Sequence, residues 1–220
     1  MSVAQPPGYH ELREALAQPG CPLCHVVGKA AESYIDNLLY ESVNDVGVRA
    51  RLRRSRGFCR AHAARLQRPG RSLGIALIEQ DVLGVLLATL AEGTRAAGQL
   101  ARDLGPQEPC PVCQHEREME RLYLEALFKS GPDSDLGRMY TASAGLCLPH
   151  FRLALHEARR PDTLAWLIKA QQGFWERLRG ELADFIRKND YRFRGEGLGA
   201  EGDSWLRALM ATAGLEQPTG

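Results

Sequence analysis

All six cysteines of this 220-residue chain belong to one pattern that occurs twice. The pattern is Cys-Pro-x-Cys followed by Cys-x-x-His, with 34 residues between the two motifs in the first copy and 33 in the second. The eight residues of the pattern are Cys21, Cys24, Cys59, His62, Cys110, Cys113, Cys147 and His150. Any fold of this chain has to account for thiol and imidazole groups that recur at these spacings.

The sequence around the motifs also repeats. A shift of 89 residues aligns Cys21 with Cys110, and a shift of 88 aligns Gly57 with Gly145. Matched spacing over such a length is typical of an internal duplication. We therefore predict two pseudo-symmetric helical metal-binding repeats, residues 1–104 and 105–190, with a C-terminal loop and short helix in residues 191–220 packed on them.

The residue types and their spacing favour metal binding. Cys-Pro-x-Cys offers two thiolates from a tight turn, and Cys-x-x-His offers a third thiolate and an imidazole from one face of a helical turn. Each copy thus supplies four ligands, which is the closed set of a structural site. We predict that Cys21, Cys24, Cys59 and His62 bind one ion and that Cys110, Cys113, Cys147 and His150 bind the other. Ligand-set frequency favours two zinc ions, and two [4Fe-4S] clusters are the alternative.

Three other interpretations of the cysteines are less favoured than metal binding. Buried free cysteines are common in cores, but two matched quartets are improbable by chance. Cys-Pro-x-Cys also resembles a thioredoxin-like redox pair, which needs a βαβ context that this sequence lacks. The CPLCH segment, which ends at His25, matches a c-type haem attachment motif, but the second copy reads CPVCQ at the same place.

The hydrophobic pattern predicts an all-α fold. No segment alternates apolar and polar residues, and aromatic residues make up only 7% of the chain. Apolar residues at helical spacing predict long helices over Ser72–Leu100 and Asp162–Lys188, and a last short helix through Trp205.

Composition and the amino-terminal sequence bear on the compartment. No apolar run approaches the roughly 18 residues that a membrane span needs, so no membrane association is expected. The first residues lack the basic and apolar regions of a signal peptide, and unpaired cysteines suit a reducing compartment. A cytoplasmic location is therefore expected.

An arginine-rich window surrounds the first Cys-x-x-His motif. Nine arginines and no acidic residue lie between Arg49 and Arg71, and the first five are Arg49, Arg51, Arg53, Arg54 and Arg56. These five are candidate contacts to nucleic acid or to a protein partner. The alternative, which the net charge of +1 favours, is an arginine surface that pairs with acidic residues and compensates an anionic metal centre.

Two further polar segments are candidates for a second site. Glu41, Asn44 and Asp45 share one helix face in the first copy only, and the charged tail contains several arginine and glutamate residues near Trp205. The simpler interpretation of the first set is a helix end that closes into a loop. No nucleophile elbow, phosphate loop or HExxH motif is present, so no catalytic residue is predicted.

The phrases CPLC, LLYESVND, GFCRAH, CPVC, GLCLPH and DYRF…EGDSW together resemble a bacterial domain family of unknown function. The resemblance covers the chain from Gly20 to about Leu209 and implies that the eight Cys and His residues are the family's defining residues. It implies no activity. The sequence as a whole predicts a non-catalytic, metal-binding helical protein that acts as an interaction or regulatory module, with a protein partner expected. An iron–sulfur redox or sensor protein and a nucleic-acid binder are the alternatives.

Overall fold

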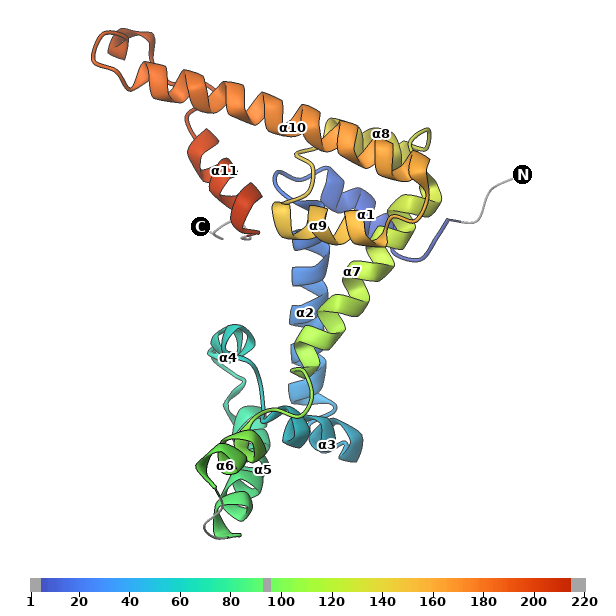
Figure 1. Cartoon of the computed structure of the whole chain (residues 1–220), viewed down its shortest axis with the longest axis vertical. Helices are drawn as coiled ribbons and strands as arrows, with labels where there is room; N and C mark the ends of the chain where they lie inside the picture. The colour runs from blue at the N-terminus through green and yellow to red at the C-terminus, as the bar shows by residue number, and fades with distance from the viewer. Residues whose placement is uncertain (1–4, 93–95, 215–220) are drawn as a thin grey trace. The chain divides into compact units, whose positions relative to one another are not determined.

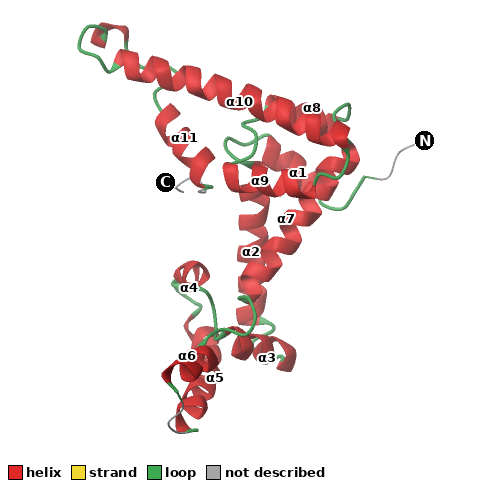
Figure 2. Cartoon of the chain, in the orientation of Figure 1, coloured by secondary structure: helices red, strands yellow, loops and turns green. Residues whose placement is uncertain are grey.

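A computed structural model describes residues 5–92 and 96–214. All regular elements within these ranges are helices, so the predicted all-α class is confirmed (Figures 1 and 2). The elements are α1 (Tyr9–Leu16), α2 (Pro22–Tyr40), α3 (Val46–Ser55), α4 (Arg60–Leu66), α5 (Ser72–Ala91), α6 (Ala97–Leu104), α7 (Pro111–Ser130), α8 (Asp135–Ala142), α9 (Leu148–Glu157), α10 (Pro161–Lys188), the 3-10 turn η1 (Arg194–Glu196) and α11 (Ser204–Ala213).

The chain forms two compact units whose limits differ from those of the predicted repeats. The first unit contains residues 1–28 and 119–220, and the second contains residues 29–118. Helices α2 and α7 each begin in one unit and end in the other. The duplication itself stays a prediction.

The core of the first unit joins side chains from α1, α7, α8 and α10. Leu12, Leu124, Leu136 and Leu167 are buried there. Tyr140 is also buried, and its ring packs edge-on against a tryptophan of α10 at 5.3 Å between centroids. Each such aliphatic side chain stabilises the fold by about 1.5–3 kcal/mol. This packing holds α9, whose first turn carries a Cys-x-x-His motif, beside the beginning of α2.

The core of the second unit forms around the later turns of α2. Ile35 and Leu38 lie on the same face of that helix and pack with Leu52 of α3, Ile78 of α5 and Val112 of α7. The segment that follows α2 therefore folds back onto the second half of this helix. The position of that contact decides which of the Cys and His motifs can meet.

Helix α5 differs from the sequence-based expectation in two ways. It ends at Ala91, and α6 begins at Ala97, so the predicted helix over Ser72–Leu100 is two helices; residues 93–95 lie outside the described part of the chain. It is also the one helix of the described residues that is long and apolar enough to cross a membrane, with a mean hydropathy of 1.8.

The expectation that no segment suits a membrane counted unbroken apolar runs, and Glu79, Gln80 and Asp81 interrupt this one. The mean hydropathy over 18 residues stays high despite the two charged side chains. By length and composition, α5 is therefore apolar enough to cross a membrane. Only 17% of the apolar window is buried. A single helix of this kind is weak support for a membrane span, since the core helix of a soluble protein passes the same test.

Candidate metal centres

Each Cys-Pro-x-Cys motif lies at the beginning of a long helix. Helix α2 begins at Pro22 and α7 at Pro111, directly after the first cysteine of each motif. Proline favours this position because its fixed φ suits the first helical turn and its missing N–H would have no partner there. The second cysteine of each motif, Cys24 or Cys113, lies in the first turn of the helix.

Each Cys-x-x-His motif begins a shorter helix. Cys59 precedes α4 and Cys147 precedes α9, both with extended backbone, and the histidine three residues later lies in the first turn on the same side. Two residues before each cysteine, Gly57 and Gly145 have φ of 82° and 71°. This left-handed conformation suits glycine and turns the chain into the motif.

The structure combines the motifs across the two copies and corrects the predicted partition. One group contains Cys21, Cys24, Cys147 and His150, and the other contains Cys59, His62, Cys110 and Cys113. All eight residues are used, but each Cys-Pro-x-Cys meets the Cys-x-x-His of the other copy. The prediction that the first four and the last four of these residues form the two groups is therefore wrong.

Helix length explains the exchange. Arg65, three residues after His62, donates a hydrogen bond from Nε to Glu32 at 2.8 Å. Glu32 lies eight residues after Cys24 along α2, which is about 12 Å of helix. The first Cys-x-x-His motif is thus held beside the later turns of α2, where it meets the beginning of α7 and not the beginning of α2.

The donor atoms of the first unit's group lie close together. The Nδ1 atom of His150 is 3.4 Å from the sulfur of Cys21, 3.3 Å from that of Cys24 and 3.2 Å from that of Cys147. The sulfurs of Cys24 and Cys147 are 3.7 Å apart. Cys24 and Cys147 are buried and the other two residues are half-buried.

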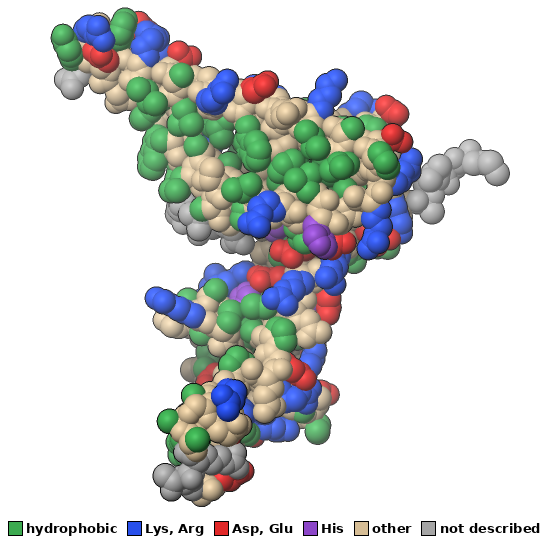
Figure 3. All heavy atoms as spheres, viewed as in Figure 1, with side chains coloured by type: hydrophobic (Ala, Val, Ile, Leu, Met, Phe, Trp, Pro, Cys, Tyr) green, Lys and Arg blue, Asp and Glu red, His purple; other side chains and the backbone are tan. Residues whose placement is uncertain are grey.

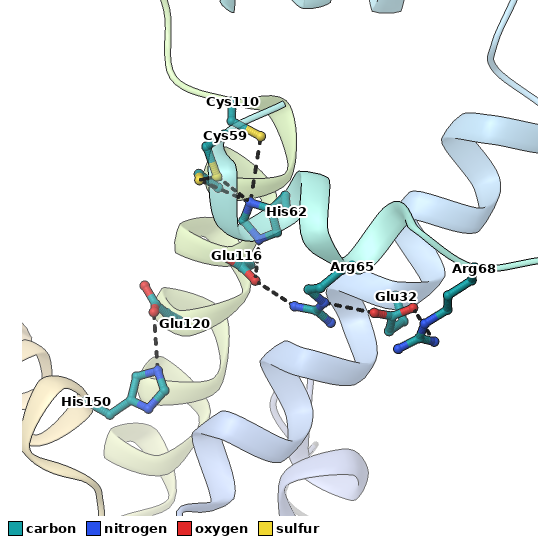
Figure 4. A network of polar contacts seen from close by, with 10 residues as sticks. Glu32, Cys59, His62, Arg65, Arg68, Cys110, Glu116, Glu120 and His150 are labelled. Carbon is teal, nitrogen blue, oxygen red and sulfur yellow. Dashed lines mark hydrogen bonds and ion pairs between the residues drawn. The ribbon is translucent and has the colours of Figure 1, made fainter. Parts of the chain in front are cut away.

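The second unit's group has the same arrangement (Figure 4). The Nδ1 atom of His62 is 3.2 Å from the sulfur of Cys59, 3.7 Å from that of Cys110 and 3.3 Å from that of Cys113. The sulfurs of Cys59 and Cys113 are 3.5 Å apart. In both groups the four donor atoms lie within 4.8 Å of one another, and no cysteine forms a disulfide.

These distances fit a single tetrahedral ion. Zinc–sulfur bonds of about 2.3 Å and zinc–nitrogen bonds of about 2.0–2.1 Å place the ligands of a tetrahedral zinc about 3.6–3.8 Å apart. The separations in both groups are within about half an ångström of this. Three sulfurs and one nitrogen are also a ligand set that zinc accepts. Both groups thus have the composition and the size of a metal site.

Two glutamates of α7 hold the histidines and were missed by the sequence analysis. The Nε2 atom of His62 donates to Glu116 at 3.0 Å, and the Nε2 atom of His150 donates to Glu120 at 3.3 Å (Figure 4). A carboxylate on the far nitrogen fixes the tautomer that leaves Nδ1 facing the ligands. The repeat gives no signal for these residues, because Val27 and Ala31 stand at the matching positions of the first copy.

Hydrogen bonds within the second unit's group favour a negative charge on one cysteine and a positive charge on the histidine. Burial disfavours the thiolate of Cys110, but hydrogen bonds from His62 and from nearby backbone N–H groups outweigh it and lower the pKa of Cys110 to about 6. Hydrogen bonds with Cys110 and Glu116 raise the pKa of His62 to about 10 against the effect of burial. Burial and the hydrogen bond with Cys59 raise the pKa of Cys113 to about 12.

The first unit's group behaves in the same way. Burial opposes ionisation of Cys21, but hydrogen bonds with Cys147, Cys24 and His150 lower its pKa. Hydrogen bonds with Cys147 and Cys21 raise the pKa of Cys24. Burial works against a charged His150, yet hydrogen bonds with Cys147, Cys21 and Glu120 raise its pKa to about 12. Each group by itself therefore balances a thiolate against an imidazolium, and a metal ion that takes all three sulfurs has to displace the remaining protons.

A buried glutamine supports the second Cys-x-x-His motif. Gln171 of α10, which is 1% exposed, accepts a hydrogen bond from the N–H of Leu146 at 3.0 Å and donates one to its carbonyl oxygen at 2.9 Å. Leu146 directly precedes Cys147. The Gln171 side chain thus satisfies the backbone N–H and carbonyl groups of a buried loop residue that has no partner in a helix or sheet.

Replacement of Gln171 by alanine is expected to lower the free energy of unfolding by about 2–4 kcal/mol, because two buried backbone groups lose their partners. Urea denaturation measures the change. Gln172→Ala is the matched control, since Gln172 is the exposed neighbour on the same helix and its loss is expected to cost less than about 0.5 kcal/mol. Equal effects of the two substitutions would contradict this role for Gln171.

Most arginines of the predicted window are paired within the second unit. Asp81 of α5 accepts hydrogen bonds from Arg49 at 3.1 Å and from Arg53 at 2.7 Å. Arg54 donates to Glu108 at 2.5 Å. These side chains tie α3 to α5 and to the segment before α7.

A second set of pairs lies beside the metal group (Figure 4). Glu32 accepts hydrogen bonds from Arg65, Arg68 and Arg71. Arg71, only 6% exposed, also donates to Asp36 at 2.6 Å. The carboxylates that balance this window therefore come from α2, some 30 residues away in sequence.

Another candidate of the window contacts uncharged groups. Arg56 donates hydrogen bonds to the carbonyl oxygens of Arg53 and Asp103. On the face drawn in Figure 3, basic and acidic side chains are interspersed. Nucleic-acid binding through this window stays a prediction that the paired arginines do not favour.

The polar set at the end of α2 has local roles. Asp45 caps α3 by accepting a hydrogen bond from the N–H of Val48 at 2.8 Å, and Glu41 accepts one from Asn37 at 2.9 Å. The structure gives no indication that Asn44 belongs to a binding site. These contacts agree with the simpler interpretation, a helix end that closes into a loop.

Comparisons with known proteins identify a family and a distant bacterial relative. The sequence model of a family of unknown function, DUF6062, matches residues 11–218. An uncharacterized 23.9 kDa protein in the xynA 3′ region of Caldicellulosiruptor sp. (strain Rt8B.4) is 26% identical over 185 residues, which cover 81% of this chain and 87% of that protein. No solved structure matches the chain. The predicted membership of a bacterial family of unknown function is confirmed.

Proposed function

The chain belongs to the family of unknown function DUF6062, and we propose that each of its two Cys3His groups binds one zinc ion as a structural centre. The observation that carries the proposal is the convergence of four donor atoms to within 4.8 Å in each group. With zinc bound, each centre cross-links a Cys-Pro-x-Cys helix start to a Cys-x-x-His helix start from a distant part of the chain.

The size of the groups favours a single ion over an iron–sulfur cluster. In a [4Fe-4S] cluster each protein ligand binds a different iron, and the irons are themselves separated by bridging sulfides, so the cysteine sulfurs stand well apart. Here two sulfurs of each group are 3.5 or 3.7 Å apart, which is close to the edge of a zinc–thiolate tetrahedron.

The ligand sets favour a structural role for the metal. Three thiolates and one imidazole fill a tetrahedral zinc and leave no position for water or substrate. The protein would then act by binding other molecules as a metal-stabilised helical interaction or regulatory module. Its unpaired cysteines suit the reducing conditions of the cytoplasm.

Metal analysis of protein purified without oxygen tests this proposal. We expect a colourless protein with two zinc ions per chain, and replacement by cobalt(II) should give the visible bands of a tetrahedral thiolate site. A brown protein that contains iron and sulfide and absorbs near about 400 nm would instead establish two clusters. Protein that is folded and metal-free as isolated would contradict both.

A further inference from the structure

Helix α5 carries a regular row of exposed residues that are apolar except for one glutamine. Counting along the helix, the residues of this row follow spacings of three and four in strict alternation, which is the heptad spacing of a coiled-coil contact. All of them are exposed. We call this row the α5 seam, and it consists of Leu73, Ala76, Gln80, Leu83, Leu87 and Leu90.

The packing of α5 in its own unit holds the seam outward. Ile78 and Val82, on the opposite side of the helix, are 1% and 3% exposed in the core of the second unit. Asp81 is bound by Arg49 and Arg53 of α3. The four leucines of the seam keep between 50% and 72% of their surface exposed. The helix cannot turn to bury them without breaking these contacts.

We propose that the α5 seam packs against the same seam of a second copy of this chain, with the two helices antiparallel. An antiparallel pair centred between Asp81 and Val82 brings Leu73 opposite Leu90 and Gln80 opposite Leu83. It also brings Ala76, the smallest side chain of the seam, opposite Leu87, so that volumes are complementary. The two Gln80 side chains come beside each other across the two-fold axis, where a polar pair fixes the register.

The exposed area suits a weak to moderate dimer. At about 30 Å² per methylene group, the seam and the exposed small residues beside it, Gly84, Ala88 and Ala91, offer on the order of 500 Å² per copy. Two copies would bury on the order of 1,000 Å², which is the lower limit for a specific interface. The small residues beside the leucines let the two helix backbones approach closely.

A lipid surface fits α5 less well than a second helix. Helices that lie on membranes carry lysine or arginine at the borders of the apolar face and aromatic anchors within it, and α5 has no lysine, arginine or aromatic residue. Its two acidic residues, Glu79 and Asp81, would meet anionic lipid unfavourably. A heptad row instead matches the knobs-into-holes packing of helix on helix.

Sedimentation equilibrium of the full, metal-loaded chain under reducing conditions tests the proposal. Over a range of about 1–100 µM, we expect the mass to rise from 24.3 kDa toward twice that value. The double substitution Leu83→Glu and Leu87→Glu should weaken association at least about 100-fold. Leu198→Glu is the matched control, since Leu198 is as exposed as Leu83, at 56% against 55%, and lies off the seam.

Charge exchange tests the antiparallel arrangement. Ala76→Lys alone and Leu87→Glu alone should each weaken the dimer, and the combination should restore it, because the antiparallel pair brings position 76 opposite position 87. A parallel pair would bring like charges together and would weaken further. Far-UV circular dichroism and metal content show that each variant is folded.

Four results would overturn the proposal. They are a wild-type chain that stays monomeric over the whole range, a control that dissociates as readily as the seam variants, a charge-exchanged variant that fails to reassociate, and a monomer that floats with vesicles of phosphatidylcholine and phosphatidylglycerol.

Discussion

Removal of both metal ions is expected to unfold the chain at room temperature. Structural zinc contributes on the order of 10 kcal/mol per site in small modules, and the whole stability of a domain is only about 5–15 kcal/mol. Without an ion, each group leaves three sulfurs and an imidazole at 3.2–3.7 Å, held only by a thiolate–imidazolium pair and the hydrogen bonds of the remaining thiols. The helix starts that meet at each group then lose their cross-link.

The measurement is a thermal melt followed by circular dichroism, before and after treatment with a zinc chelator in the presence of a non-thiol reductant. We expect the cooperative transition to disappear and to return when zinc is restored, whereas magnesium should have no effect because it avoids sulfur ligands. A metal-free chain that still melts cooperatively within a few degrees of the loaded one would argue that the groups are simply clusters of buried thiols.

The sequence was sufficient to identify the residues of both Cys3His groups, because the residue types themselves show which side chains could act as metal ligands. Cys-Pro-x-Cys and Cys-x-x-His each fix the spacing of two donors by local helix geometry, and the structure forms both motifs at helix starts. The all-α class followed from the hydrophobic period for the same local reason. Properties that depend on a few adjacent turns are therefore the ones that spacing predicts well.

The partition of the ligands could not be predicted because it depends on lengths and contacts far apart in the chain. Two motifs of each kind can be combined in two ways, and both satisfy the same residue counts. The choice follows from the 19-residue length of α2 and from the contact of Arg65 with Glu32, which holds the first Cys-x-x-His motif away from the beginning of that helix. Assuming that each duplicated copy closes on itself was the physical error.

The residues that support the groups were also missed because they lie outside any repeat. Glu116 and Glu120 both come from α7, four residues apart, and each binds the histidine of a different group. The arginine window likewise finds its carboxylates on α2 and α5, which are distant in sequence. The near-zero net charge of the chain indicated that these arginines are paired, but it could not identify the carboxylates that pair with them.

Pairs of cysteine substitutions are expected to separate the crossed partition from a sequential one. Cys24→Ser should reduce the zinc content from two ions to one by destroying its group. Adding Cys147→Ser should remove no further zinc, because both residues belong to that group. Adding Cys59→Ser instead should remove the second ion, because Cys59 belongs to the other group. The sequential partition predicts the opposite result for both double variants.

Native mass spectrometry after competition with a chelator counts the ions bound to each variant, and urea denaturation gives the energetic counterpart. Two substitutions in one group should be strongly non-additive, since the second acts on a centre that has already lost its ion, and two substitutions in different groups should be close to additive. Each single substitution should remove stabilisation on the order of 10 kcal/mol from its own unit, so a second substitution in the same group should leave the urea transition of the other unit unchanged. Ser143→Ala is the control for a structural change near Cys147, because the hydroxyl of Ser143 donates to the carbonyl oxygen of Tyr140 and accepts from the N–H of Gly145 and contacts no residue of the group. One zinc retained by the variant with Cys24→Ser and Cys59→Ser would show that the two motifs of the first copy share an ion after all.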